Sequence, residues 1–197
     1  MGKYCQRGRP VVQCPKEKQI TLAAGLLSGD LVAQCCPNCQ GHWISSEVYS
    51  TWQEKHPPTE SEPVLIDRLL ETTCEPAPLD SKAALCPECN AYLARARVSL
   101  KTPFYVERCP NCKGIWCDRG EWDVLEKQGL AGLIPRLFAT DWQTLVRERE
   151  LAAQERRATI DKLGPELADR IFALAEALEN HPYGDFGVAY LMRRFDR

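Results

Sequence analysis

Two distant stretches of this sequence carry the same cysteine-rich pattern. Residues 36–43 read Cys-Pro-Asn-Cys-Gln-Gly-His-Trp and residues 109–116 read Cys-Pro-Asn-Cys-Lys-Gly-Ile-Trp, so six of eight positions are identical. A Cys-Pro pair precedes each stretch, at Cys14 and at Cys86, and lies 22 and 23 residues upstream of it. Because the motif and its spacing both recur, the chain is predicted to contain two copies of one structural unit.

The second copy has four cysteines at the spacing of a metal site. Cys86 and Cys89 form one Cys-x-x-Cys pair, Cys109 and Cys112 form another, and 19 residues separate the two pairs. Four thiolates spaced in this way are typical of tetrahedral zinc. A redox pair or an iron–sulfur centre uses similar residues, but the doubled pairs favour zinc over both. The segment is also short enough to need such a staple in order to fold.

The residues around the cysteines predict β-hairpins. Residues 94–100 alternate apolar and polar side chains, as a half-buried strand does, and residues 104–108 form the returning strand. In the first copy, residues 28–30 supply a turn and residues 30–34 return. Residues 118–121, Asp-Arg-Gly-Glu, resemble a capping box, so a helix is expected to begin there.

The second copy resembles a known family. Cys86-Pro87-Glu88-Cys89, followed by residues 109–121, is similar to the transcription factor IIB-type zinc ribbons. Members of that family carry Gly-x-Trp and an Asp-x-Gly-Glu helix start after the second cysteine pair. The resemblance covers residues 82–129 and implies a zinc ribbon. The ligands that it implies are Cys86, Cys89, Cys109 and Cys112.

The first copy lacks one of the four cysteines. Glu17 stands where the second copy has Cys89. The cysteines that remain as candidate metal ligands are Cys14, Cys36 and Cys39. Cys5, Cys35 or His42 could supply a fourth ligand, or the hairpin could be held by packing without metal. Three ligands and an open position would be a catalytic arrangement, but no general base is marked nearby. We expect this degenerate copy to bind zinc too.

Other cysteines and the tryptophans are given structural roles. Cys117 aligns with Ile44 of the first copy, so it is expected in an apolar slot rather than on a metal. Cys74 has no identifiable partner. Trp43 and Trp116 are expected to cover the metal hairpins rather than to stack on bases.

Composition narrows the class of protein. The 197 residues carry a net charge of −2 and no apolar run long enough for a membrane span. A sequence pI near 6.0 does not suggest a phosphate-neutralising surface over the whole protein. The 11 cysteines fall mostly in clusters, and the N-terminus lacks an export signal, so metal binding in the cytoplasm is expected rather than disulfides.

These features predict a small α+β fold of tandem zinc-ribbon hairpins followed by a helical C-terminal segment. A polar helix is expected at about residues 141–163 and an amphipathic helix at 165–179. The predicted parts are a degenerate ribbon at 1–55, an acidic proline-rich connector at 56–80, a zinc ribbon at 81–129, and a helical region with an aromatic tail at 130–197.

No catalytic constellation is visible, so the protein is predicted not to be an enzyme. We expect an adaptor or assembly factor that binds a protein partner through the C-terminal helix. One alternative is a nucleic-acid-binding ribbon that uses Arg95 and Arg97. A second is a zinc-linked chaperone or thiol redox protein.

Overall fold

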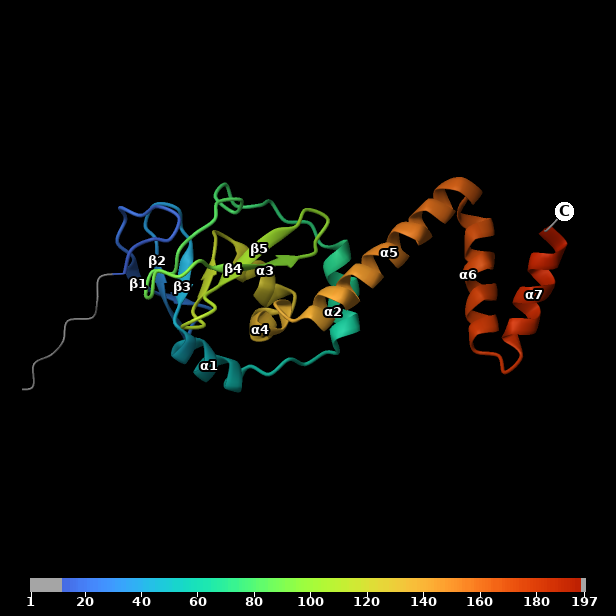
Figure 1. The fold of residues 1–197 in the computed structure, drawn as a ribbon, viewed down its shortest axis with the longest axis horizontal. Helices are drawn as coiled ribbons and strands as arrows, with labels where there is room; N and C mark the ends of the chain where they lie inside the picture. The colour runs from blue at the N-terminus through green and yellow to red at the C-terminus, as the bar shows by residue number, and fades with distance from the viewer. Residues whose placement is uncertain (1–11, 196–197) are drawn as a thin grey trace, which may run out of the picture. The chain divides into compact units, whose positions relative to one another are not determined.

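The computed structural model describes residues 12–195 (Figure 1). Contacts divide the chain into two units, one that ends at Val146 and one that begins at Arg147. The first unit holds six antiparallel strands in the order β1-β2-β3-β6-β5-β4. The predicted α+β class, with helices after the strands, is confirmed.

Each copy contributes a β-hairpin. In the first copy β1 (Ala23–Leu27) pairs with β2 (Leu31–Cys35), and in the second β4 (Ala94–Val98) pairs with β5 (Phe104–Arg108). The turn between β1 and β2 contains Ser28 and Gly29, both with positive φ. Gly29 adopts this conformation without steric cost.

Short third strands join the two copies into one sheet. β3 (His42–Ile44) and β6 (Ile115–Cys117) pair antiparallel, with Trp43 opposite Trp116. In the motif alignment these two tryptophans are equivalent residues, so the copies meet about a local pseudo-twofold axis. The predicted repeat is therefore also a repeat in space, and each copy covers an edge of the other.

Glycines on each side admit the opposite tryptophan. A Cβ on Gly41 would lie 2.2 Å from the Trp116 ring, and one on Gly114 would lie 2.2 Å from the Trp43 ring. Both rings are almost completely buried. The Gly-x-Trp pattern of each copy thus serves the contact between copies, because only glycine leaves room for the ring.

A helix follows the third strand in both copies. These helices are α1 (Ser46–Lys55) and α3 (Glu121–Lys127). Trp52 of α1 meets Trp122 of α3 edge to face, with ring centroids 5.3 Å apart. The sequence patterns had not indicated α1.

The predicted capping box forms only in part. Glu121 accepts a hydrogen bond from the Asp118 N–H at 2.8 Å, as expected. The side chain of Asp118 does not cap α3, because its Oδ1 accepts from the Trp116 indole N–H at 2.8 Å. The N-cap residue is Gly120, whose φ of 79° suits glycine.

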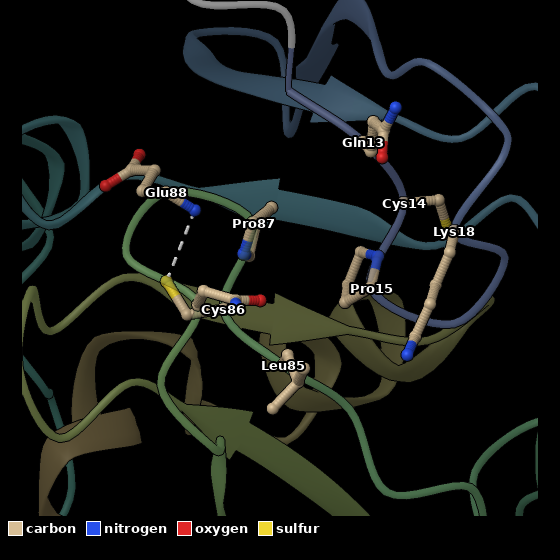
Figure 2. A pocket seen from close by; sticks show the side chains of 9 residues that line it. Gln13, Cys14, Pro15, Lys18, Leu85, Cys86, Pro87 and Glu88 are labelled. Carbon is tan, nitrogen blue, oxygen red and sulfur yellow. Dashed lines mark hydrogen bonds between the residues drawn. The ribbon is translucent and has the colours of Figure 1, made fainter.

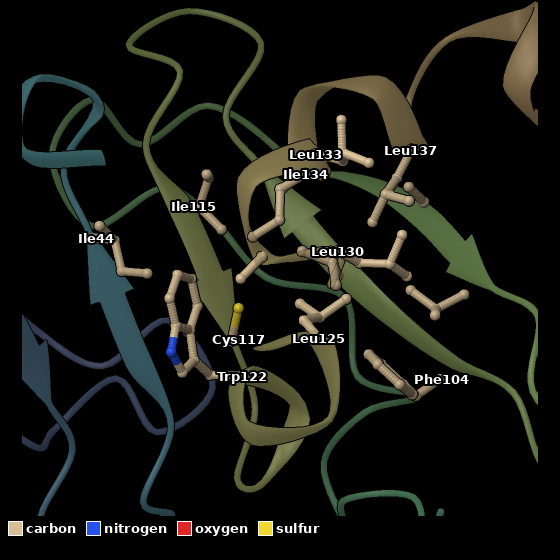
Figure 3. Packing of buried hydrophobic residues seen from close by; sticks show 14 of the residues in the cluster. Ile44, Phe104, Ile115, Cys117, Trp122, Leu125, Leu130, Leu133, Ile134 and Leu137 are labelled. Atoms are coloured by element: carbon tan, nitrogen blue, oxygen red, sulfur yellow. The ribbon is translucent and has the colours of Figure 1, made fainter. Parts of the chain in front are cut away.

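The main core lies on one face of the sheet. Ile44, Ile115 and Cys117 point into it from β3 and β6, and α3 adds Trp122 and Leu125 (Figure 3). Residues after α3 close it through a short 3-10 turn (Ala131–Leu133) and α4 (Ile134–Leu137).

The stretch expected to connect the copies also enters this core. It contains α2 (Glu62–Glu71), a helix too short to be assigned from sequence, whose buried residues are Leu65, Ile66 and Leu69.

The second unit is helical. It contains residues 147–163 of α5 (Thr140–Leu163), then α6 (Pro165–Glu179) and α7 (Gly184–Phe195). Helices α6 and α7 contact each other as a hairpin. The expected helices at 141–163 and 165–179 are confirmed, and the aromatic tail is itself helical.

Candidate metal centres

Four sulfurs of the second copy converge on one point. Their Sγ atoms all lie within 4.8 Å of one another. The Cys86–Cys112 pair is 3.5 Å apart and the Cys89–Cys109 pair 3.4 Å apart. A disulfide would need about 2.05 Å, whereas a zinc tetrahedron with bonds of about 2.3 Å has edges of about 3.8 Å. The donor set fits zinc.

Tight turns present these sulfurs in pairs. The N–H groups of Cys36, Cys86 and Cys109 each donate to the carbonyl five residues further along. In all three turns the residue after the second cysteine has positive φ. The N–H groups of Glu88 and Cys89 also point at the Cys86 sulfur, at 3.4 and 3.5 Å. Such donors favour the thiolate that a metal needs.

The thiols of this cluster differ in acidity. Burial raises the pKa of Cys86 to about 11. Burial acts in the same direction on Cys109, but the N–H groups of Cys112 and Asn111 outweigh it and lower its pKa to about 7. These N–H groups therefore favour the thiolate form of Cys109.

A second cluster contains three sulfurs and a carboxylate. Cys14, Cys36, Cys39 and Glu17 place their ligand atoms within 4.8 Å of one another. The Cys14 and Cys39 sulfurs are 3.6 Å apart, and Glu17 Oε2 lies 3.6 Å from the Cys36 sulfur. With a zinc–oxygen bond of about 2.0 Å, the oxygen–sulfur edge would be about 3.5 Å. This set also fits zinc.

Glu17 is thus the fourth candidate metal ligand of this cluster, and the sequence analysis did not identify it. The signal was present in the alignment, because Glu17 occupies the position of Cys89 and a carboxylate is itself a zinc ligand. Of the ligands considered in its place, Cys35 and His42 stand outside the cluster. Cys5 lies outside the described residues.

The turn that carries Glu17 is built differently from the other three. Here the Cys14 N–H donates to Ile20, six residues on rather than five. The Cys14 sulfur accepts from the Glu17 N–H at 3.3 Å, and the other Glu17 oxygen accepts from Asn38 at 2.6 Å. The longer turn accompanies the longer side chain, so the carboxylate reaches the sulfurs while tied to Asn38.

A small pocket separates the first turns of the two copies. Its volume is ≈ 250 Å³, and Figure 2 shows the Cys14–Pro15 and Cys86–Pro87 turns on its two sides. Lys18 and Glu88 also line it. The pocket is the gap between these two turns.

A buried lysine ties the first cluster to the second copy. Lys16, with no exposed surface, contacts Glu107 at 2.5 Å and Asp118 at 3.2 Å. It also donates to the carbonyls of Leu79 and Lys82. Burial raises the pKa of Glu107 to about 7 even though Lys16 opposes that shift. The Lys16–Glu107 ion pair is therefore shielded from water.

The remaining cysteines take non-ligand places. Cys117 is completely buried in the main core, as predicted, and burial raises the pKa of its thiol. Cys74 packs against the same core, and Cys35 does so from β2. Neither belongs to a metal cluster among the described residues.

The residues that suggested nucleic-acid binding are engaged within the protein. Trp43 donates to Glu88 at 2.9 Å, and Trp116 donates to Asp118. Arg95 lies over the Tyr105 ring at 4.2 Å and contacts Asp80. The tryptophans cover the metal clusters, as expected, and present no face to a base.

Comparison with known proteins agrees with the second cluster. Residues 85–127 match the family model described as transcription factor zinc-finger, a zinc ribbon of the transcription factor IIB type. Searches among curated proteins and among solved structures found no match. No helix in the described part of the chain is long and apolar enough to cross a membrane. Residues 85–127, with Cys86, Cys89, Cys109 and Cys112 gathered at one point, form a zinc ribbon of the transcription factor IIB type.

Proposed function

We propose that the protein is a non-enzymatic adaptor, in which two zinc-stabilised ribbons form one rigid body and the C-terminal helices bind a protein. The observation that carries the proposal is the apolar surface of α6 and α7. Leu167, Ile171 and Leu174 are each 40–46% exposed on α6, and Met192, which lines the same groove as Ile171 and Leu174, is 68% exposed on α7. Contiguous apolar surface of this kind marks protein-binding sites.

The ribbons support a structural role for the metal. Cysteines of both clusters pack among buried residues that include Trp43 and Trp116. Zinc with four protein ligands leaves no open position for substrate, and its binding free energy contributes to folding. A reducing cytosol would keep the thiols available for the metal.

The experiment compares capture of cellular proteins by the full chain and by a Leu174→Asp variant, both loaded with zinc. The matched control is Val64→Asp on α2, because Val64 is similarly exposed at 51% but belongs to the first unit. Loss of captured proteins with Leu174→Asp alone supports the adaptor role. Equal capture by both variants contradicts it.

The nucleic-acid alternative is tested on the same preparations. Binding of single-stranded RNA or DNA at low salt, lost on Arg97→Ala, would replace the adaptor proposal.

A further inference from the structure

The C-terminal unit leaves nearly all of its apolar side chains uncovered. Of the 15 large hydrophobic residues exposed in the described chain, eleven lie within residues 147–195. Only Ala168 and Gly184 are buried in that stretch. A helical hairpin without a core is marginal in water, since a chain this short usually needs a staple or a partner. The unit therefore needs a surface to cover it.

The exposed side chains of α6 and α7 line a groove of ≈ 620 Å³ between the two helices. Its large apolar lining residues are Ile171, Leu174, Leu178, Val188, Leu191 and Met192. Met192 in the groove is 68% exposed, and Phe195, one turn further along α7, is 83% exposed. Covering the exposed parts of the groove residues, with Leu167 and Phe195, would bury on the order of 700 Å² per chain, close to the share of about 800 Å² that one partner has in a standard interface.

Charge is distributed unequally along the hairpin. Its loop end, where α6 finishes and α7 begins, carries Glu176, Glu179 and Asp185, all exposed. Its open end carries Arg193 and Arg194 in the last turn of α7, together with Glu166, Asp169 and Arg170 in the first two turns of α6, so three arginines and two acids give a net charge of +1 there against −3 at the loop end. A partner that suits this surface is a helix pair with a basic group opposite the loop end and an acidic group opposite the open end.

We propose that this partner is a second copy of the chain. The two hairpins pack groove to groove in an antiparallel four-helix arrangement related by a twofold axis. This inference rests on the proposed function, since it names the partner of the same surface.

In the twofold arrangement, the second copy supplies both the basic group opposite the loop end and the acidic group opposite the open end. Antiparallel packing sets Arg193 and Arg194 of each copy beside Glu179 and Asp185 of the other, and an isologous interface does so twice. Parallel packing would place acid against acid. The apolar stripes of all four helices then face one another, as in a helix bundle.

Sedimentation of the full-length, zinc-loaded chain tests the pairing. The expected species at micromolar concentration has twice the chain mass of 22.3 kDa. Val188→Asp should make it monomeric, because the new carboxylate would lie inside the bundle. Val64→Asp, of similar exposure on α2, should leave the dimer intact. A monomeric wild-type chain, or a dimer that survives Val188→Asp, overturns the proposal.

A charge variant tests the direction of packing without touching the apolar face. Neutralising the loop end with Glu176→Gln, Glu179→Gln and Asp185→Asn should weaken the dimer about tenfold at low salt. The effect should fade at high salt. A dimer that becomes tighter on neutralisation would overturn the antiparallel arrangement, because it would mean that like charges had been facing each other.

The same samples separate this inference from the adaptor role. A monomeric wild-type chain that captures another protein, and loses it on Val188→Asp, overturns self-pairing and keeps the adaptor. If Val188→Asp changes neither mass nor capture, both proposals fail.

Discussion

Replacing Lys16 by methionine is expected to destabilise the ribbon unit strongly. Lys16 and Glu107 are both fully buried, and the second oxygen of Glu107 has no hydrogen-bond partner in the structure. Methionine keeps most of the side-chain length but removes the ammonium group. The remaining cation near Glu107 is Arg95, whose Nε lies 3.6 Å away on a side chain 27% exposed.

The magnitude follows from the burial of the pair. Removing one member of a buried ion pair costs about 3–5 kcal/mol, because the other charge stays behind without water. Since the pKa of Glu107 is already about 7, a proton replaces part of the lost charge, and we expect the lower half of that range. This is a large share of a net stability of roughly 5–15 kcal/mol.

Urea unfolding of the zinc-saturated protein, followed by tryptophan fluorescence, measures the effect. Lys18→Met is the matched control, because Lys18 lies in the same turn but is exposed. Zinc content must stay unchanged, so that loss of metal is not mistaken for loss of the ion pair. Glu107→Gln placed in the Lys16→Met chain should recover part of the loss. If Lys16→Met is as stable as Lys18→Met, the lysine does not hold the copies together.

Three further predictions concern the contact between copies and the metals. Gly41→Ala and Gly114→Ala should each lower the free energy of unfolding by about 1–3 kcal/mol in urea, because the new Cβ would meet a buried tryptophan. Gly29→Asn is the control and should lower it much less, because Gly29 lies in an open turn with φ of 77°. Elemental analysis should find two zinc ions per wild-type chain and one per Glu17→Ala chain. Glu17→Cys should keep both ions and lose them to a chelator more slowly. A single ion in the wild type would refute the role of Glu17 as a ligand. Complete removal of zinc should abolish the cooperative unfolding transition of the first unit, and a metal-free chain with an unchanged transition would show that packing alone is sufficient.

The zinc ribbon was predictable because its signals are local. Two Cys-x-x-Cys pairs at a set spacing define a tetrahedral site whatever surrounds them, and the alternation around Ala96 defines a strand facing a core. The identity between the copies predicted a repeat, and the slot for Cys117 followed from its alignment with Ile44. Both residues are fully buried in the main core.

What was missed depends on distant contacts. Lys16 looks like an ordinary surface lysine in sequence, and only its meeting with Glu107, 91 residues away, accounts for its burial. Likewise, α1 has a mixed composition. Its buried residues are Tyr49 and Trp52, and they pack against the core that both copies form. No window of sequence contains the partner surfaces that stabilise such segments.

The first turns of the two copies have diverged in sequence and in the contacts that they make. In the alignment Lys16 corresponds to Glu88, and Glu17 to Cys89. Glu88 accepts from Trp43 of the first copy, whereas Lys16 enters the second copy to reach Glu107. Two identical ribbons related by a true twofold axis would have to carry the same residue at both places.

Joining the copies in one chain removes that restriction. One side of the pseudo-twofold contact keeps a four-sulfur site and a carboxylate that holds a tryptophan. The other side combines a buried cation with a carboxylate metal ligand. The double substitution Lys16→Glu and Glu17→Cys should therefore give the first cluster a fourth sulfur. It should also destabilise the sheet, because Glu107 would face a second buried carboxylate in place of the ammonium group. If this double variant unfolds at a higher urea concentration than the wild type, the fourth sulfur contributes more to stability than the ion pair between the copies does.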